Sequence, residues 1–235
     1  MLLSVDQIAK SFGGNAAVGG VSFSVAPGEI VGIIGPNGSG KTTTMSMVAG
    51  LLPVDRGRIQ FDGVDVTGAA PYDQRRRRIG ATYQNARLFD ELTLRHNVQL
   101  SAQAKHSADS HEIEARSHAW MEKLALGHVA DNLAFALSGG QRKLGELARV
   151  LVTAPTLILL DEPTAGVAPS LHDVVADALR EEQRRGAGIV LVSHDLPWTF
   201  LLASRIIVMD AGRVLLEGTS ADIGKDRRLM DAYLT

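Results

Sequence analysis

The sequence contains no cysteine, which excludes disulfides, thiolate metal ligands and cysteine nucleophiles together. It has no excess of charge of one sign, because 24 Lys and Arg stand against 26 Asp and Glu. The net charge of −2 implies no surface for nucleic acid or another polyanion. No 18 apolar residues run together, and residues 1–14 lack a basic region followed by a long apolar stretch. We therefore expect neither a membrane span nor an export signal, and a cytoplasmic location.

The residues that are present favour a compact globular protein. Hydrophobic residues make up 45% of the 235 positions and charged residues 21%, so enough apolar side chain is available to offset the entropy lost on folding. We find no internal repeat and no low-complexity linker. This length suits one domain, with room for a small attached subdomain.

Short apolar runs alternate with stretches of helical spacing over much of the chain. The runs are residues 29–34, 79–83, 157–160, 189–193 and 206–209. This alternation predicts an α/β fold with a mainly parallel sheet. Residues 157–160 are apolar at successive positions, as in strands covered on both faces, so we expect this strand inside the sheet.

Other stretches depart from this alternation. Segments 2–10, 21–25 and 58–61 look like strands without long helices between them, which predicts a small antiparallel β subdomain. Between about 94 and 153 the strand pattern gives way to helical spacing, which predicts an inserted α-helical subdomain. Near the end, residues 210–212 form a turn signal between two strand-like runs and predict a hairpin.

The sharpest local signal satisfies the phosphate-loop pattern G-x-x-x-x-G-K-[ST]. Its residues are Gly35, Pro36, Asn37, Gly38, Ser39, Gly40, Lys41, Thr42 and Thr43. Glycines let backbone N–H groups approach phosphates, and the start of the following helix adds a positive dipole end. Lys41 is placed to neutralise the β and γ phosphates of a nucleotide, and the Thr42 hydroxyl to coordinate Mg²⁺. A glycine-rich turn with an exposed lysine is the plain alternative.

Two adjacent acids follow the apolar run 157–160. Ligands of a doubly wound sheet gather at this end of its strands, so Asp161 is a candidate for the Mg²⁺ shell. Glu162 is a candidate general base that polarises the water attacking the γ phosphate. Two acids after a strand can also simply solvate its end.

The pentapeptide Leu-Ser-Gly-Gly-Gln at residues 137–141 resembles the signature of ATP-binding cassette (ABC) proteins. Ser138 can cap a helix that begins there, while Gly139 and Gly140 leave backbone N–H groups bare before Gln141, a second anion cradle. The resemblance implies that this cradle closes over the ATP bound to a second subunit, which gives a head-to-tail dimer.

Further positions resemble the family's motifs. Gln84 resembles the Q-loop glutamine, residues 165–168 the D-loop, and His194 the H-loop histidine. The resemblance implies that Gln84 reaches Mg²⁺ or the attacking water, and that His194 contacts the γ phosphate and that water. Phe12 stands where the family places an aromatic that stacks on adenine. A lone histidine after a strand can also be a surface or core residue, and Phe12 can simply pack.

The resemblance covers nearly the whole chain and implies an α/β P-loop NTPase core within a single ABC ATPase domain over residues 1–235. It implies an ATPase with ATP and Mg²⁺ as cofactors, peripheral on the cytoplasmic face of the cell membrane. Its partners would be transmembrane permease subunits and a second ABC ATPase subunit, identical or paralogous, and no nucleic acid. A soluble ABC ATPase of DNA repair or translation is the alternative, against which stand the single cassette and the absence of cysteine.

A finer resemblance points to the ATP-binding subunits of branched-chain amino acid importers. It rests on residues 82–89, 92–94 and 165–169 and on Asn97. It implies import of these amino acids or of a related small solute such as urea or amides, and it admits a solute-binding protein as a further partner. His96 departs from the pattern, because that group usually has an acid there. The four cations at residues 75–78 are assigned no site.

Overall fold

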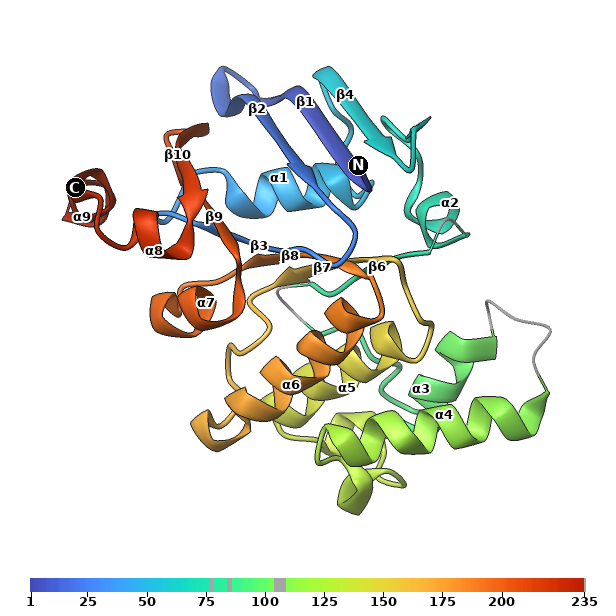
Figure 1. Cartoon of the computed structure of the whole chain (residues 1–235). Coiled ribbons are helices and arrows are strands. Elements are labelled where there is room, and N and C mark those ends of the chain that lie inside the picture. Colours follow the sequence, from blue (N-terminus) through green and yellow to red (C-terminus); the bar gives the residue numbers. More distant parts are fainter. Residues whose placement is uncertain (77, 84–85, 104–108, 235) are drawn as a thin grey trace.

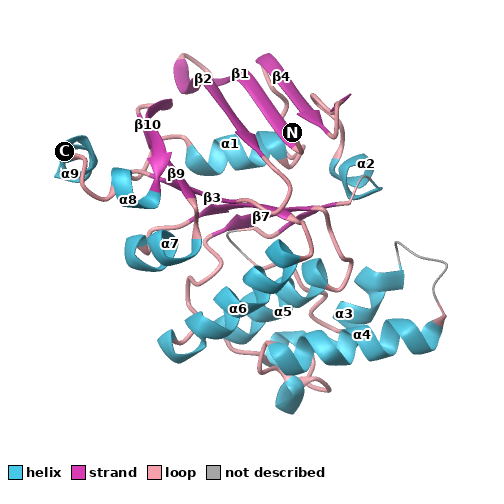
Figure 2. Cartoon of the chain, viewed as in Figure 1, coloured by secondary structure: helices cyan, strands magenta, loops and turns pink. Residues whose placement is uncertain are grey.

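The computed structural model describes residues 1–76, 78–83, 86–103 and 109–234, which alternate between strands and helices in two layered sheets (Figures 1 and 2). The strands are β1 Leu3–Phe12, β2 Asn15–Val25, β3 Ile30–Ile34, β4 Arg56–Phe61, β5 Val64–Asp65, β6 Ile79–Ala81, β7 Leu157–Asp161, β8 Gly188–Val192, β9 Arg205–Asp210 and β10 Arg213–Thr219. The α-helices are α1 Lys41–Val48, α2 Pro71–Arg76, α3 Leu94–Gln103, α4 Ser110–Lys123, α5 Gly139–Leu151, α6 His172–Arg184, α7 Leu196–Leu202, α8 Ser220–Ile223 and α9 Arg227–Leu234. Short 3₁₀ turns are η1 Gly127–Val129, η2 Ala134–Ala136 and η3 Pro169–Leu171.

The larger sheet has six strands in the order β10-β9-β3-β8-β7-β6. All neighbours are parallel except β9 and β10, which form the predicted hairpin. Strand β7 lies between β8 and β6, inside the sheet as its apolar run predicts. Strand β6 is shorter than the predicted 79–83, because the backbone of Tyr83 bonds to side chains of α5 instead of to β7.

Alternate residues of each central strand face two different hydrophobic cores. In β7, Leu157 and Leu159 pack on the side of α1 and the antiparallel sheet, whereas Ile158 and Leu160 pack on the side of α5, α6 and α7. Figure 1 shows α1 on one side of the sheet and α5 and α6 on the other. This double burial explains why the central strands are apolar at every position.

The second sheet is antiparallel, in the order β2-β1-β4-β5. Strand β2 begins at Asn15, earlier than the predicted start at residue 21. The β1–β2 register shifts between the pairs Ile8–Val21 and Ala9–Gly19, and Gly20 has a φ of 101° at this irregularity. A bulge with a left-handed glycine interrupts the alternation of apolar and polar residues, so the pattern does not reveal the first half of the strand.

The stretch predicted to be helical, residues 94–153, holds α3, α4, the turns η1 and η2, and α5. Leu94, Val98, Trp120 and Leu144 pack together in the core on the α5 side of the large sheet. Helix α5 thus joins this helical layer to the sheet that carries the phosphate loop. Within the described part of the chain, no helix combines the length and apolar character that a bilayer crossing requires.

Candidate nucleotide site

The phosphate loop connects the end of β3 to the start of α1, and glycine is required at two of its positions. Gly35 has a φ of 147°, and a Cβ there would lie 2.1 Å from the carbonyl oxygen of Met209. Gly40 has a φ of 97°, and a Cβ there would lie 2.6 Å from the carbonyl oxygen of Ala17. Gly38, with a φ of 80°, has nothing within 4 Å of its Cβ position. Backbone packing therefore fixes the loop at Gly35 and Gly40, whereas the loop is open at Gly38.

Lys41 begins α1 with its side chain folded into the loop. Its Nζ donates hydrogen bonds of 2.8 Å to the carbonyl oxygens of both Gly35 and Pro36. Burial lowers the pKa of Lys41, while the charges of Glu162 and Asp161 act in the opposite direction. The loop thus holds a buried ammonium beside Asp161, which ends β7, and Glu162, which follows it.

Asp161 ends β7 and shares a cavity of about 200 Å³ with Thr42. Among the described residues, neither Asp161 Oδ1 nor Glu162 Oε1 has a hydrogen-bond partner, although both atoms are buried. Burial raises the pKa of each carboxyl group. Buried oxygens of this kind fit a hard cation such as Mg²⁺, which takes only one or two protein oxygens and completes its shell with phosphate and water. No cluster of three His, Asp or Glu able to hold a metal occurs in the described ranges.

His194 lies directly against Glu162. Its Nε2 is 3.0 Å from Glu162 Oε1, in a geometry outside that of a good hydrogen bond. Its backbone N–H donates to Glu162 Oε2 at 3.2 Å. The imidazole remains 57% exposed, so the ring borders the solvent side of the carboxylate. Glu162 itself has a φ of 51°, a left-handed conformation that is uncommon for a residue with a side chain.

The pentapeptide 137–141 begins α5, and the expected cap is confirmed. The Ser138 hydroxyl accepts from the Gln141 N–H at 3.3 Å, and the Gln141 side chain accepts from the Ser138 N–H at 2.9 Å. A Cβ at Gly140 would lie 2.6 Å from the carbonyl oxygen of Gly166, whereas Gly139 faces open space. Gly140 is thus packed against residues 165–168, and the backbone amides of Gly139 and Gly140, which the cap does not use, are left for a ligand.

The structure brings Lys41, Thr42, Asp161, Glu162 and His194 together. It does not bring the signature to the same place. In the described part of the chain, no hydrogen bond or ion pair joins residues 138–141 to the phosphate loop. The two helices that these segments begin, α1 and α5, cover opposite faces of the large sheet. One chain therefore carries two separate anion cradles.

Of the two other predicted site residues, the structure describes Phe12 but not Gln84. Phe12 ends β1 with 50% of its surface exposed, in a hairpin whose second strand touches the phosphate loop where Ala17 meets Gly40. Gln84 lies outside the described residues, so its assignment as a metal and water ligand stays a prediction.

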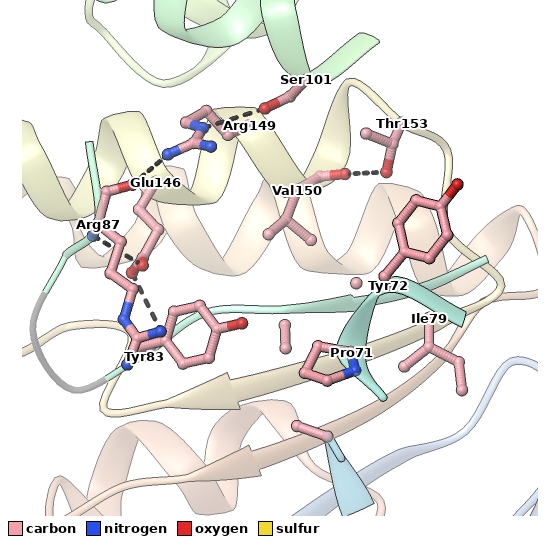
Figure 3. Close-up of a pocket in the computed structure, with 13 residues that line it drawn as sticks. Pro71, Tyr72, Ile79, Tyr83, Arg87, Ser101, Glu146, Arg149, Val150 and Thr153 are labelled. Atoms are coloured by element: carbon pink, nitrogen blue, oxygen red, sulfur yellow. Dashed lines mark hydrogen bonds between the residues drawn. The ribbon is translucent and has the colours of Figure 1, made fainter. Parts of the chain in front are cut away.

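A larger cavity of about 410 Å³ opens beside the site, where residues of β6, α2, α3 and α5 meet (Figure 3). Its polar lining includes Tyr72, Tyr83, Arg87, Glu146 and Arg149. Tyr83 and Arg87 also line the smaller cavity that reaches Thr42 and Asp161. The two cavities therefore share a wall.

Sequence reasoning missed three residues around these sites. Lys143 and Glu146 are buried charges of α5 that bond to the backbone of Tyr83, and Tyr233 of α9 bonds to the phosphate loop. The available signal was weak, because two charges near the apolar Leu144 and Leu147 of a helix are easily assigned to its solvent face.

Comparison with known proteins adds a family, a relative and two solved structures. A family model described as "ABC transporter" matches residues 18–165. The lipopolysaccharide export system ATP-binding protein LptB of Haemophilus influenzae is 34% identical over 233 residues, which are 99% of this chain and 97% of that protein. The crystal structure of a nucleotide-free ATP-binding cassette from an ABC transporter is 31% identical, with a TM-score of 0.88 over 100% of this chain and 99% of that one. A dimeric ATP-binding cassette in a post-hydrolysis state with ADP and Pi is 27% identical, with a TM-score of 0.85 over 93% of this chain and 99% of that one.

Proposed function

The chain belongs to the ABC transporter family as an ATP-hydrolysing, Mg²⁺-dependent ATP-binding subunit, and we propose that it drives export of a lipopolysaccharide-like amphiphile. The transport path belongs to separate membrane subunits, with which ABC ATPases work as dimers. The observation that carries the proposal is the likeness to a lipopolysaccharide export protein over 99% of this chain.

Import of branched-chain amino acids, which residues 82–89 and 165–169 suggested, finds no support in this relative. The physical reason lies in where those residues are. Thr82 and Tyr83 line the cavity beside the phosphate loop, and Gly166 packs on the signature helix. These positions border the nucleotide site and the helix that begins at Gly139, so their pattern gives no information on the transported molecule. A solute-binding partner likewise has no support.

For the nucleotide site, we propose that Lys41 and the loop amides bind the β and γ phosphates. The loop is preorganised for this role, because the carbonyl oxygens of Gly35 and Pro36 hold the Lys41 ammonium and backbone packing fixes Gly35 and Gly40. Thr42 and Asp161 would hold Mg²⁺, which neutralises charge on the phosphates. The exposed ring of Phe12 stacks on the adenine.

We propose Glu162 as the general base. The raised pKa of Glu162 makes its carboxylate a better acceptor for a proton from water. The backbone N–H of His194 donates a hydrogen bond to this carboxylate and fixes the orientation of the Glu162 side chain. The exposed side of the imidazole then faces the γ phosphate and the attacking water. The support for these roles is that the two residues and Lys41 share one site.

A complete site needs a second ABC ATPase subunit, identical or paralogous. The backbone amides of Gly139 and Gly140, flanked by the capping residues Ser138 and Gln141, lie on the other side of the sheet from the phosphate loop, so they serve the ATP of a partner chain. The membrane subunits, in this proposal, contact the surface around the 410 Å³ cavity, which borders both the helical layer and the nucleotide site. The ATPase is then peripheral on the cytoplasmic side of the membrane.

The test begins with affinity purification of the tagged chain from native membranes in mild detergent, followed by mass spectrometry. Co-purification of multi-span proteins is expected. The complex is then reconstituted in vesicles, and ATPase activity is compared with lipopolysaccharide, with leucine and without substrate, with Lys41→Ala as the inactive control. Stimulation by lipopolysaccharide supports the proposal. Stimulation by leucine alone overturns export, and purely soluble partners would favour the DNA repair or translation class.

A further inference from the structure

Helix α5 carries two buried charged side chains one turn apart, on the side that faces the shared wall of the two cavities. Lys143 is 5% exposed and Glu146 is 3% exposed, and Lys143 Nζ lies 4.0 Å from Glu146 Oε2. Burying a charged pair is unfavourable unless further hydrogen bonds satisfy both groups. The other hydrogen bonds of Lys143 and Glu146 therefore show which parts of the chain the pair keeps in place.

Glu146 accepts two backbone hydrogen bonds from the segment that leaves β6. Its Oε2 accepts from the N–H of Tyr83 at 3.3 Å, and its Oε1 accepts from the N–H of Arg87 at 3.1 Å, as Figure 3 shows. One carboxylate thus holds the backbone at both Tyr83 and Arg87. The Arg87 guanidinium in turn lies 4.1 Å over the ring of Tyr83.

Lys143 contacts the carbonyl side of the same residue, Tyr83. Its Nζ donates to the carbonyl oxygen of Tyr83 at 2.5 Å and to that of Asp161 at 2.9 Å. Tyr83 is therefore fixed through its N–H and through its C=O by two residues of one helical turn. The Lys143 ammonium thereby links Tyr83 to Asp161, whose carboxylate lines the same cavity as Thr42.

We infer that Lys143 and Glu146 form a positioning pair that sets the Tyr83 and Arg87 wall against Asp161 and thereby controls ATP turnover. Neither side chain has to touch nucleotide. The pair acts through the wall, whose one side faces the nucleotide cavity and whose other side faces the larger cavity. The inference rests on the proposed nucleotide site, in which Asp161 and Glu162 act.

The alternative is that the pair only stabilises the fold, and enzyme kinetics separates the two roles. A misplacement of about 1 Å can lower turnover about a hundredfold. Glu146→Ala is therefore expected to lower kcat by about ten- to a hundredfold, while the Kd for ATP changes less than about twofold, because Lys41 and the phosphate loop are untouched. Glu146→Gln, which can accept at only one oxygen, is expected to fall between the parent and Glu146→Ala.

Glu182 provides a matched control, because it is a buried glutamate of α6 that pairs with Arg185 and lines neither cavity. Burial raises its pKa as it does that of Glu146. Glu182→Gln is expected to lower the urea midpoint and leave kcat per folded molecule unchanged. If Glu146→Ala fails to fold, Glu146→Gln and Lys143→Met supply the same comparison.

The inference is overturned if folded Glu146→Ala, or both milder variants, keep kcat within about twofold of the parent. It is also overturned if the Kd for ATP rises as much as kcat falls. A double variant of Lys143→Met and Glu146→Gln should lose no more turnover than the worse single variant, because both act on one wall. If Glu162→Gln keeps full turnover, the site assignment fails instead, which distinguishes the two failures.

Discussion

The hydroxyl oxygen of Tyr233 accepts a hydrogen bond of 2.8 Å from the backbone N–H of Gly35, the first residue of the phosphate loop. The two residues are 198 positions apart in the sequence. The contact ties helix α9 to the loop between β3 and α1. Burial raises the pKa of the Tyr233 hydroxyl, so this phenol remains neutral at physiological pH.

Replacement Tyr233→Phe removes the acceptor and keeps the ring. Because a typical intramolecular hydrogen bond contributes about 1 kcal/mol, the free energy of unfolding should fall by about that amount. Urea denaturation followed by circular dichroism measures the change. An unchanged midpoint would show that α9 does not support the loop.

Replacement Lys41→Ala should weaken ATP binding by about ten- to a hundredfold, because a charge-assisted contact to phosphate contributes about 1.5–3 kcal/mol. Calorimetric titration with ATP measures the affinity. Lys123→Ala is the control, since Lys123 pairs with Glu181 on the opposite side of the sheet. Normal ATP affinity in Lys41→Ala would remove the basis of the phosphate-loop assignment.

Replacement Glu162→Gln should preserve ATP affinity and lower kcat by about a hundred- to ten-thousandfold, the usual contribution of a general base. The variant should also accumulate as a nucleotide-bound dimer, because closure no longer ends in hydrolysis. Light scattering with and without ATP reports the dimer. Hydrolysis at the parental rate would exclude Glu162 as the base.

The pH profile of turnover follows from the same residue. Burial raises the pKa of Glu162 above its ordinary value of 4.5, and the nearby His194 opposes this only in part. A base must be ionised to accept a proton, so kcat should fall as the pH is lowered, beginning above pH 4.5. An acidic limb that lies below this value would contradict the assignment. Circular dichroism at each pH confirms that the fold persists.

The two signature glycines should respond differently to alanine. A methyl at Gly140 meets the carbonyl oxygen of Gly166 at 2.6 Å, so Gly140→Ala should cost about 1–3 kcal/mol of stability. Gly139→Ala meets nothing within 4 Å and should leave the stability unchanged or slightly higher. Urea midpoints of the two variants provide the comparison. Equal losses would mean that the packing against residues 165–168 is not what requires glycine.

Local spacing in the sequence determined the features whose partners are close along the chain. The phosphate loop needs glycines, a lysine and a threonine at fixed offsets, and the Ser138 cap bonds to a residue three positions later. Strand β7 is recognisable because both of its faces are buried. These properties follow from backbone geometry within a few residues, so they can be read without the fold.

Tertiary structure decided the contacts that join distant positions. Glu146 reaches the amide of Tyr83, and Tyr233 reaches that of Gly35, across 63 and 198 positions. No periodicity marks such partners, because any buried charge or phenol could pair with any backbone group that the topology brings near. The same holds for the end of β6 and for the difference between Gly139 and Gly140, which depend on the neighbour that the folded chain places beside them.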